Sequence, residues 1–118
     1  MEAYQWEARP LAIVGSGRDV DEYRSEVLER AAELQDRDMV VWWSDGGDLV
    51  QWRDGLVTRF EASAKVLDGL AGEQPAVVLI GKDGGIKLAE PIPYELDLIF
   101  ALIDAMPMRQ NEMRARSD

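Results

Sequence analysis

Apolar positions follow two different periods along this chain, and the two periods predict an α/β succession of elements. Short continuous apolar runs at 11–14, 39–43 and 76–80 are typical of buried strands. Residues 19–36 instead carry apolar side chains at steps of three and four, which predicts one helix with Asp19 as its N-cap. The first half of the chain therefore predicts a strand, a helix and a second strand.

Two Asp-Gly pairs between apolar runs predict β-hairpins. Asp54-Gly55 separates the runs 49–52 and 56–60, and Asp83-Gly84 separates the third strand from residues 86–88. Both residues of a two-residue hairpin turn adopt positive φ, which these residue types tolerate. We expect a small hairpin insert at the first pair and a closing antiparallel pair at the second.

Proline and glycine delimit the remaining helices. Residues 64–70 predict a short helix that ends at Gly72, and residues 96–103 predict a last helix whose first turn contains Pro93. Pro107 cannot lie inside that helix without a kink, so the chain is expected to change direction after Ala105.

The order of these elements predicts a single thioredoxin-like α/β domain over residues 1–118, with a core at about 9–105 and a C-terminal segment at 106–118. A strand-helix-strand start requires parallel strands joined by a crossover, and the closing hairpin adds an antiparallel pair. We therefore expect a four-stranded mixed sheet in the order 2-1-3-4, with flanking helices and the hairpin insert.

Composition and charge restrict the classes of partner. Of 118 residues 47% are apolar, which suits one packed domain, and 23 acidic against 13 basic residues give a net charge of −10. The absence of a basic cluster argues against nucleic acid and anionic membrane surfaces as partners. Ten carboxylates against four arginines lie between Gly15 and Asp48, which we interpret as a solvated surface that keeps the chain soluble.

The chain contains no cysteine and no histidine, and this excludes several chemistries. A thiolate nucleophile, a disulfide, a cysteine metal site and a Ser-His-Asp triad are all impossible. No apolar run approaches the roughly 20 residues of a membrane-spanning helix, so we expect no membrane insertion. The first residues lack the basic and apolar regions of a signal peptide, although a chain can begin after such a peptide has been removed.

Four stretches together resemble one family, which is named domain of unknown function 4174. They are Trp6 with Arg9-Pro10-Leu11, Arg37-Asp38-Met39-Val40-Val41, residues 79–87 and residues 103–113. The resemblance implies a thioredoxin-like fold and a binding or structural role, with no known reaction. Members of the family are short, usually exported bacterial proteins, or modules of vertebrate extracellular-matrix proteins that carry sushi repeats. The resemblance therefore implies export, to the periplasm for a bacterial protein.

Residues 75–84 also resemble the run of thioredoxin-like proteins in which the proline is cis and borders the active site. This resemblance predicts a cis bond between Gln74 and Pro75. The chain departs from redox-active thioredoxins after its first strand, where Gly15-Ser16-Gly17-Arg18 occupies the Cys-x-x-Cys position. Disulfide exchange needs a thiolate, so we expect no redox activity.

The sequence thus predicts a non-redox binding or structural module with a protein partner and without a cofactor or metal. The alternative is a non-redox enzyme that uses carboxylates and lysine near the turn after the first strand. Gly15-Ser16-Gly17 resembles a phosphate-binding turn but has Val20 where a third glycine is needed. Asp45-Gly46-Gly47-Asp48 has two carboxylates for a hard cation, and a solvated turn is the simpler interpretation.

The candidate ligand or partner surface combines the turn after the first strand, the second hairpin turn and the methionine-rich end of the chain. Packing of residues 106–113 over the sheet edge is expected first, and a partner site there second. The oligomeric state is left open. The candidate residues are Gly15, Ser16, Gly17, Arg18, Pro75, Lys82, Asp83, Met106, Met108, Arg109 and Met113.

Overall fold

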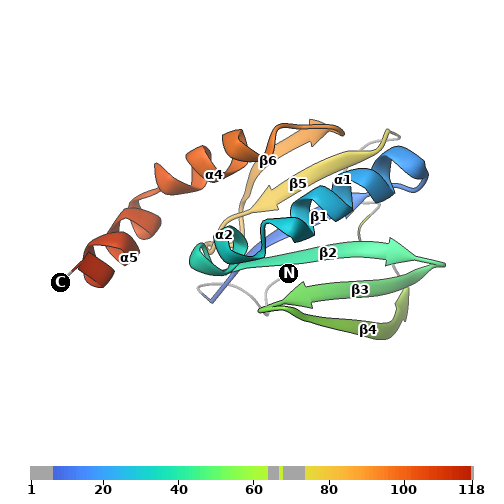
Figure 1. The fold of residues 1–118 in the computed structure, drawn as a ribbon, viewed down its shortest axis with the longest axis horizontal. Coiled ribbons are helices and arrows are strands. Elements are labelled where there is room, and N and C mark those ends of the chain that lie inside the picture. Colours follow the sequence, from blue (N-terminus) through green and yellow to red (C-terminus); the bar gives the residue numbers. More distant parts are fainter. Residues whose placement is uncertain (1–6, 64–66, 68–73, 118) are drawn as a thin grey trace.

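Strand β1 (Arg9–Val14) is an inner strand of the sheet, and its residues are buried on both faces. It pairs in parallel with β2 (Met39–Asp45) and antiparallel with β5 (Ala76–Ile80). These elements belong to a computed structural model that describes residues 7–63, 67 and 74–117 (Figure 1). The parallel β1–β2 pair confirms the expected strand-helix-strand start.

The sheet has six strands in the order β4-β3-β2-β1-β5-β6, so the prediction of four strands in the order 2-1-3-4 is wrong. The insert hairpin extends the sheet beyond β2, with which β3 pairs from Val41↔Trp52 to Asp45↔Asp48. Without β3, the apolar strand β2 would leave its backbone donors and acceptors at an open edge. The remaining elements are β3 (Asp48–Arg53), β4 (Leu56–Ser63), β6 (Ile86–Pro91), α1 (Arg18–Glu29), α2 (Ala31–Asp36), α4 (Leu96–Asp104) and α5 (Pro107–Ser117).

Both predicted hairpins are confirmed. Asp54 and Gly55 have φ values of 52° and 83° between β3 and β4, as a two-residue turn of this kind requires. Asp83 and Gly84 lie in the turn between β5 and β6, where Gly84 has a φ of 86°. Local turn chemistry was therefore sufficient to place these two connections.

The single helix expected over residues 19–36 is two helices. Gly17 is the N-cap of α1 with a φ of 118°, and no side chain caps the helix, so Asp19 lies in the first turn instead. The chain turns at Arg30 (ψ 37°), whose N–H donates to the carbonyl of Val27. After this break α2 packs against β2, and Leu34 of α2 is fully buried.

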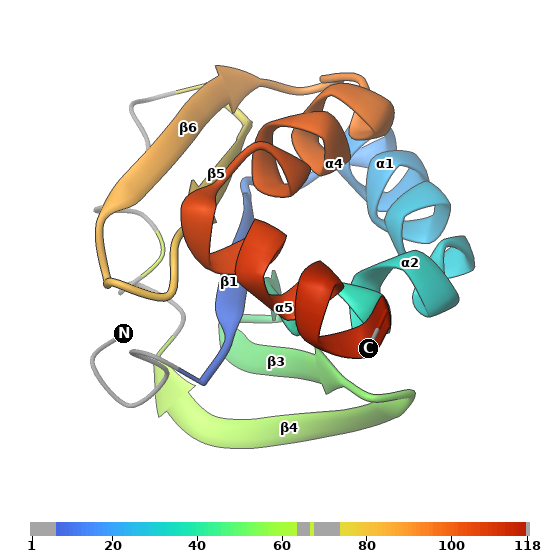
Figure 2. The same cartoon turned by 90° about the vertical axis from the view of Figure 1, so that its left-hand side faces the viewer.

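Of the described helices, α1, α2, α4 and α5 lie on the same side of the sheet (Figure 2). Because side chains alternate along a strand, neighbouring residues enter different cores. Trp43 belongs to the cluster beneath the helices, whereas Trp42 belongs to the cluster on the other face and stacks on Phe60 at 5.4 Å. Both tryptophans are buried.

Proline marks the end of α4 as expected, because α4 ends at Asp104 and α5 begins at Pro107. The cis bond expected at Gln74–Pro75 is wrong, because Ile92–Pro93 is the cis bond in the described part of the chain. An X–Pro bond favours trans by only about 0.5–1 kcal/mol, so tertiary context decides the isomer. The helix expected at 64–70 lies outside the described residues, except for Leu67, which is helical and buried.

Candidate functional site

The predicted surface residues lie in two groups, because β1 and β5 run antiparallel. The turn after β1, with Gly15 to Arg18 and Pro75, lies at one end of the sheet. Lys82 and Asp83 follow β5 and therefore lie at the other end, close to the start of β1. Met106, Met108, Arg109 and Met113 belong to the α4–α5 junction and α5 at that same end.

The turn after β1 is packed tightly against Pro75. Gly15 has a φ of 120°, and a Cβ built on it would lie 3.0 Å from Cβ of Pro75. Val20 occupies the position of the third glycine of a phosphate-binding turn, and its side chain is buried in the core. Arg18 is 90% exposed and pairs with Glu22. The turn therefore has the features of a strand-to-helix connection and lacks those of a phosphate site.

The two carboxylates of the Asp45–Asp48 turn are both paired with Arg59. This guanidinium binds the Asp45 carboxylate and lies 3.1 Å from Oδ2 of Asp48. In residues 7–63, 67 and 74–117, no group of three or more acidic side chains is placed to hold a metal ion. The solvated-turn interpretation fits this geometry better than the cation loop does.

Eight charged side chains meet where α5 packs against the ends of β1 and β5, and we call them the ion-pair cluster. Their residues come from the stretches that carry the family resemblance and from the end of α2. Four are cationic and four anionic, so the cluster is electrically balanced. The members are Arg9, Arg37, Lys82 and Arg109 with Asp36, Asp38, Asp104 and Glu112.

Glu112 joins α5 to two strands. Its carboxylate accepts hydrogen bonds from both terminal nitrogens of Arg9, at 3.2 and 3.0 Å, and from Nζ of Lys82 at 3.0 Å. Arg9 is 1% exposed and also donates to the carbonyl oxygen of Arg37 at 2.7 Å. Lys82 donates in addition to Asp38 at 2.7 Å. One carboxylate on the last helix thus fixes the start of β1 and the end of β5.

Arg109 connects the same helix to α2 and α4. Its guanidinium donates to Oδ2 and the backbone carbonyl of Asp36 at 2.5 and 2.7 Å, and to Asp104 at 3.0 Å. Arg37 donates to Asp104 from the other side and lies over the ring of Phe100, 4.5 Å from its centroid. On α5, Arg109 is thus buried and Glu112 is half-buried, whereas Met108 is 37% exposed.

Two carboxyl groups of the cluster, those of Glu112 and Asp104, have a lowered pKa. Burial raises the pKa of Glu112, but hydrogen bonds from Arg9 and Lys82 outweigh burial and leave this pKa below its usual value. Burial acts in the same direction on Asp104, and its pKa is likewise lowered by the guanidinium groups of Arg37 and Arg109. Neither group is therefore suited to donate a proton near neutral pH.

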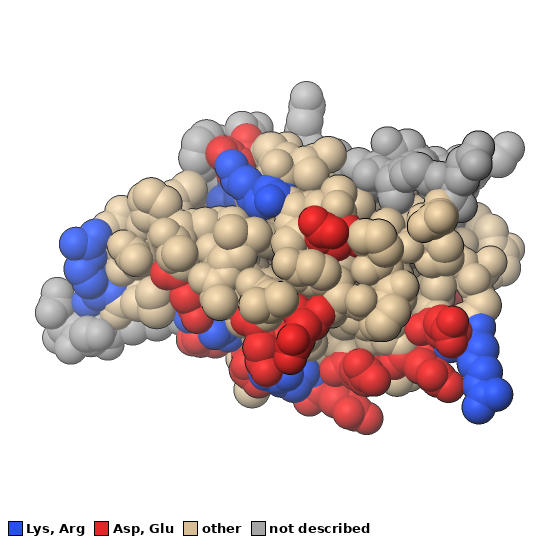
Figure 3. Space-filling view, turned by 90° about the horizontal axis from the view of Figure 1, so that it is seen from above, with Lys and Arg blue, Asp and Glu red and all other residues tan. Residues whose placement is uncertain are grey.

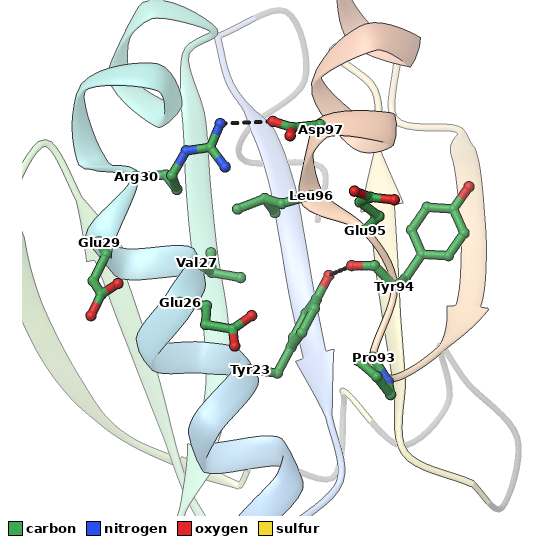
Figure 4. Close-up of a pocket in the computed structure, with 10 residues that line it drawn as sticks. All are labelled: Tyr23, Glu26, Val27, Glu29, Arg30, Pro93, Tyr94, Glu95, Leu96 and Asp97. Carbon is green, nitrogen blue, oxygen red and sulfur yellow. Dashed lines mark hydrogen bonds and ion pairs between the residues drawn. The ribbon is translucent and has the colours of Figure 1, made fainter.

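A groove lies between α1 and the segment that leads from β6 into α4, and we call it the acidic groove (Figure 4). Its volume is about 560 Å³. In Figure 4 Leu96 points toward α1, and the Tyr23 hydroxyl donates to the carbonyl oxygen of Tyr94 at 2.7 Å across the gap. The lining residues are Tyr23, Glu26, Val27, Glu29, Arg30, Pro93, Tyr94, Glu95, Leu96 and Asp97.

Carboxylates outnumber cations in the acidic groove. Glu26, Glu29, Glu95 and Asp97 are exposed, and Arg30 closes one end by pairing with Asp97 at 2.8 Å and with Glu33 outside the lining. Two further hollows continue along α1 and are lined by Asp19, Asp21, Glu22 and Glu26 among others. Figure 3 shows Asp and Glu side chains gathered along one side of the molecule.

Tyr23 forms a rigid part of the groove wall. Its side chain is buried, and burial, together with the charge of Glu26, raises the pKa of its hydroxyl far above the usual value. The hydroxyl therefore stays protonated and remains a hydrogen-bond donor to Tyr94. This bond joins two segments that are 71 residues apart in the sequence.

Comparison with known proteins identifies the family. A family model described as "Domain of unknown function (DUF4174)" matches residues 1–112. The chain belongs to this family. No curated protein and no solved structure matches the chain.

In this member of the domain of unknown function 4174 family, the four resemblance stretches contribute most of the ion-pair cluster. Sequence reasoning missed both this cluster and the acidic groove, because each is assembled from segments far apart in the chain. The signal for the groove was the surplus of carboxylates between Gly15 and Asp48, which was interpreted as a solvated surface. Among the described residues, no helix combines the length and apolar character needed to cross a membrane.

Proposed function

We propose that this domain is a non-redox, thioredoxin-like binding module whose acidic groove receives a protein segment that carries Lys or Arg residues. The groove's combination of an apolar floor and exposed carboxylates is the observation that carries the proposal. Pro93 and Leu96 supply the floor, and Glu26, Glu29 and Glu95 supply the charge. A segment that alternates apolar and basic side chains matches both features.

The thioredoxin-like part of the proposal is supported by four consecutive strands of the sheet. They run in the order β2-β1-β5-β6, with β1 and β2 parallel and the closing pair antiparallel. The turn of Gly15 to Arg18 contacts Pro75. Because the chain contains no cysteine, this end of the sheet has no thiolate for disulfide exchange.

A protein partner is favoured over nucleic acid or an anionic membrane by the sign of the charge. The net charge is −10, and the carboxylates of the groove and of α1 would repel phosphate groups. Ordinary protein segments can present both the cations and the apolar side chains that the groove requires. The partner is thus best described by its chemistry, as a basic and partly apolar segment.

The alternative of an enzyme that uses carboxylates and lysine near the turn after β1 receives less support. Lys82 and Lys87 lie at the opposite end of the sheet from that turn. The carboxyl groups with resolved shifts, including Asp83 and Glu33, have a lowered pKa because Lys87 and Arg30 respectively donate to them. A general acid near neutral pH needs the opposite shift.

The test is a titration with a seven-residue, acetylated and amidated peptide of alternating Lys and Leu, followed by amide chemical shifts of the ¹⁵N-labelled protein. We expect saturable shifts at Tyr23, Glu26 and Glu95. A second peptide with Glu in place of each Lys keeps the apolar residues and should not bind. Equal binding of both peptides would contradict the proposal.

A matched pair of variants separates the groove from net charge. E26Q/E95Q removes two carboxylates of the groove, and E7Q/D54N removes two exposed carboxylates elsewhere. We expect the first variant to weaken binding of the Lys-Leu peptide about fivefold, since exposed ion pairs are individually weak. The second should bind like the unmodified protein, and equal weakening by both variants would reject the groove as the site.

A further inference from the structure

A second pocket lies at the end of the molecule opposite the turn after β1, and neither the family nor the proposed function assigns it a role. Its volume is about 310 Å³, within the range of small-molecule sites. It is enclosed by the start of β1, the β5–β6 turn and the junction of α4 with α5. Its walls include Arg9, Lys82, Lys87, Met106, Pro107 and Met108.

The charged groups that face this pocket are mainly cationic, although the protein as a whole is acidic. Three cations, Arg9, Lys82 and Lys87, line it together with one carboxylate, that of Asp83. Two carboxylates that bind these cations, those of Asp38 and Glu112, are not part of the lining. Among the lining residues cations therefore outnumber carboxylates by three to one, although Arg9, Lys82 and Lys87 are each paired with a carboxylate.

Hydrogen-bond donors remain available on these cations. Arg9 is 1% exposed, and its Nε has no hydrogen-bond partner among the described residues. An ammonium group has three N–H donors, and Lys82 uses two of them, for Asp38 and Glu112. A buried donor without a partner is costly, so an acceptor that reaches this wall is stabilised.

The remaining wall of the pocket is apolar and adaptable. Met106 is half-buried, Met108 is 37% exposed, and Pro107 lies between them at the start of α5. Methionine side chains rearrange easily around ligands of irregular shape. A ligand that fits both walls needs an anionic group and a short apolar group.

We propose that this pocket binds a small organic anion in which a carboxylate is attached to a short apolar group. The carboxylate lies against Arg9, Lys82 and Lys87, and the apolar group lies against Met106 and Met108. The site is separate from the acidic groove, so its occupation does not depend on the basic segment proposed above.

The proposal is tested with octanoate as the probe, monitored by amide chemical shifts of the full chain. We expect saturable shifts confined to residues 81–87 and 106–109. Octan-1-ol has the same tail without the charge, and acetate has the charge without the tail, so both should bind more weakly. Equal binding of octan-1-ol, no saturable shift with octanoate, or shifts centred elsewhere would overturn the proposal.

Two variants with the same change in net charge show whether the pocket's cations matter. K87Q removes a partly exposed cation of the pocket, whereas R18Q removes an exposed cation at the other end of the sheet. We expect K87Q to weaken octanoate binding about threefold and R18Q to leave it unchanged. Equal affinities of the two variants would overturn the assignment.

A carboxylate beside an apolar group occurs both in free acids and at the C-terminus of a peptide. An acetylated tetrapeptide that ends in Leu with a free carboxylate provides the second source. Tighter binding of octanoate identifies a free acid, and tighter binding of the peptide identifies a chain terminus. If neither binds at residues 81–87, the proposal is wrong.

Discussion

The ion-pair cluster and the acidic groove use the same kinds of side chain in opposite ways. In the cluster, Arg9 and Arg109 are almost fully buried and each carboxylate binds at least one cation. In the groove, Glu26, Glu29 and Glu95 are exposed and share one sign of charge. A buried side chain that is paired with an opposite charge joins elements of the fold. An exposed side chain among others of the same charge is free to bind an oppositely charged partner.

This difference predicts that the two regions respond oppositely to the loss of a charge. Removing the Glu112 carboxylate leaves the buried Arg9 without an ion-pair partner and Lys82 with Asp38 alone, which is unfavourable. Removing a carboxylate from the groove reduces the repulsion between neighbouring carboxylates and leaves no buried charge without a partner. The stability of variants of the two regions therefore tests this contrast.

Truncation after Ala105 should produce the largest loss of stability. It removes Arg109 and Glu112 together, so that Arg9 and Lys82 lose a shared counterion. We expect the midpoint of thermal unfolding to fall by more than about 10 °C, or the cooperative transition to disappear. Circular dichroism measures both outcomes. An unchanged midpoint would mean that α5 is not a structural part of the domain.

The single substitution Glu112→Gln should destabilise the protein less, because the amide keeps the size of the side chain. The Glu112 side chain is 19% exposed, so the stability lost is smaller than for a fully buried ion pair. We expect a loss of about 2 kcal/mol in the free energy of unfolding, or about 8 °C in the midpoint. Urea titration gives the free energy. E7Q, at an exposed site, is the control and should be neutral.

The pH dependence of stability should come largely from the same cluster. The pKa values of Glu112 and Asp104 are lower in the folded protein than their ordinary values. Their stabilisation is therefore complete above the unfolded pKa and is lost as pH falls through the folded pKa. We expect the unfolding midpoint to stay level from pH 8 to about 6 and to fall below about pH 5.

The variant Glu112→Gln also tests the origin of this acid sensitivity. With that carboxyl removed, the decrease in midpoint between pH 7 and pH 4 should be smaller than in the unmodified protein. Equal decreases in the two proteins would assign the acid sensitivity to other carboxylates. Scanning calorimetry at several pH values measures both slopes.

The sequence predicted the elements that depend on local chemistry. Asp54-Gly55 and Asp83-Gly84 predicted their turns because these residues tolerate positive φ, and Pro107 predicted the end of α4. The six-stranded sheet was not predictable in this way. The β3–β4 hairpin extends the sheet by pairing with the edge of β2. No local pattern of residues specifies that strand as its partner.

For the same reason the acidic groove was not predicted, and the pocket beside Lys82 was predicted only in part. Lys82, Asp83 and Met106 were singled out, and they share a pocket, but Arg9 was not recognised as its buried cation. The cis bond placed at Pro75 came from a resemblance, and tertiary context placed it at Pro93 instead. Ion pairs such as Arg9–Glu112 join positions 103 residues apart, which a single sequence does not reveal.

Tyr23→Phe should have a moderate effect, because it removes one buried hydrogen bond within the groove wall. The carbonyl of Tyr94 then loses the hydroxyl donor that lies 2.7 Å away. We expect a loss of about 1 kcal/mol in the free energy of unfolding by urea. Binding of the Lys-Leu peptide should also weaken, because the two walls of the groove are no longer joined. A variant as stable as the unmodified protein would show that this bond is dispensable.

Glu29→Gln should have the smallest effect and the opposite sign. Glu29 is the last residue of α1, where a negative charge opposes the helix dipole, and Glu26 lies one turn before it. The variant should therefore unfold at a temperature about 1 °C higher at low ionic strength. Because exposed charges are screened by salt, the difference should vanish in 1 M sodium chloride, which leaves the effect of Glu112→Gln largely intact. Differential scanning calorimetry of both variants at the two salt concentrations makes the comparison. A lower midpoint for Glu29→Gln would mean that this carboxylate, like those of the ion-pair cluster, contributes to holding the chain together.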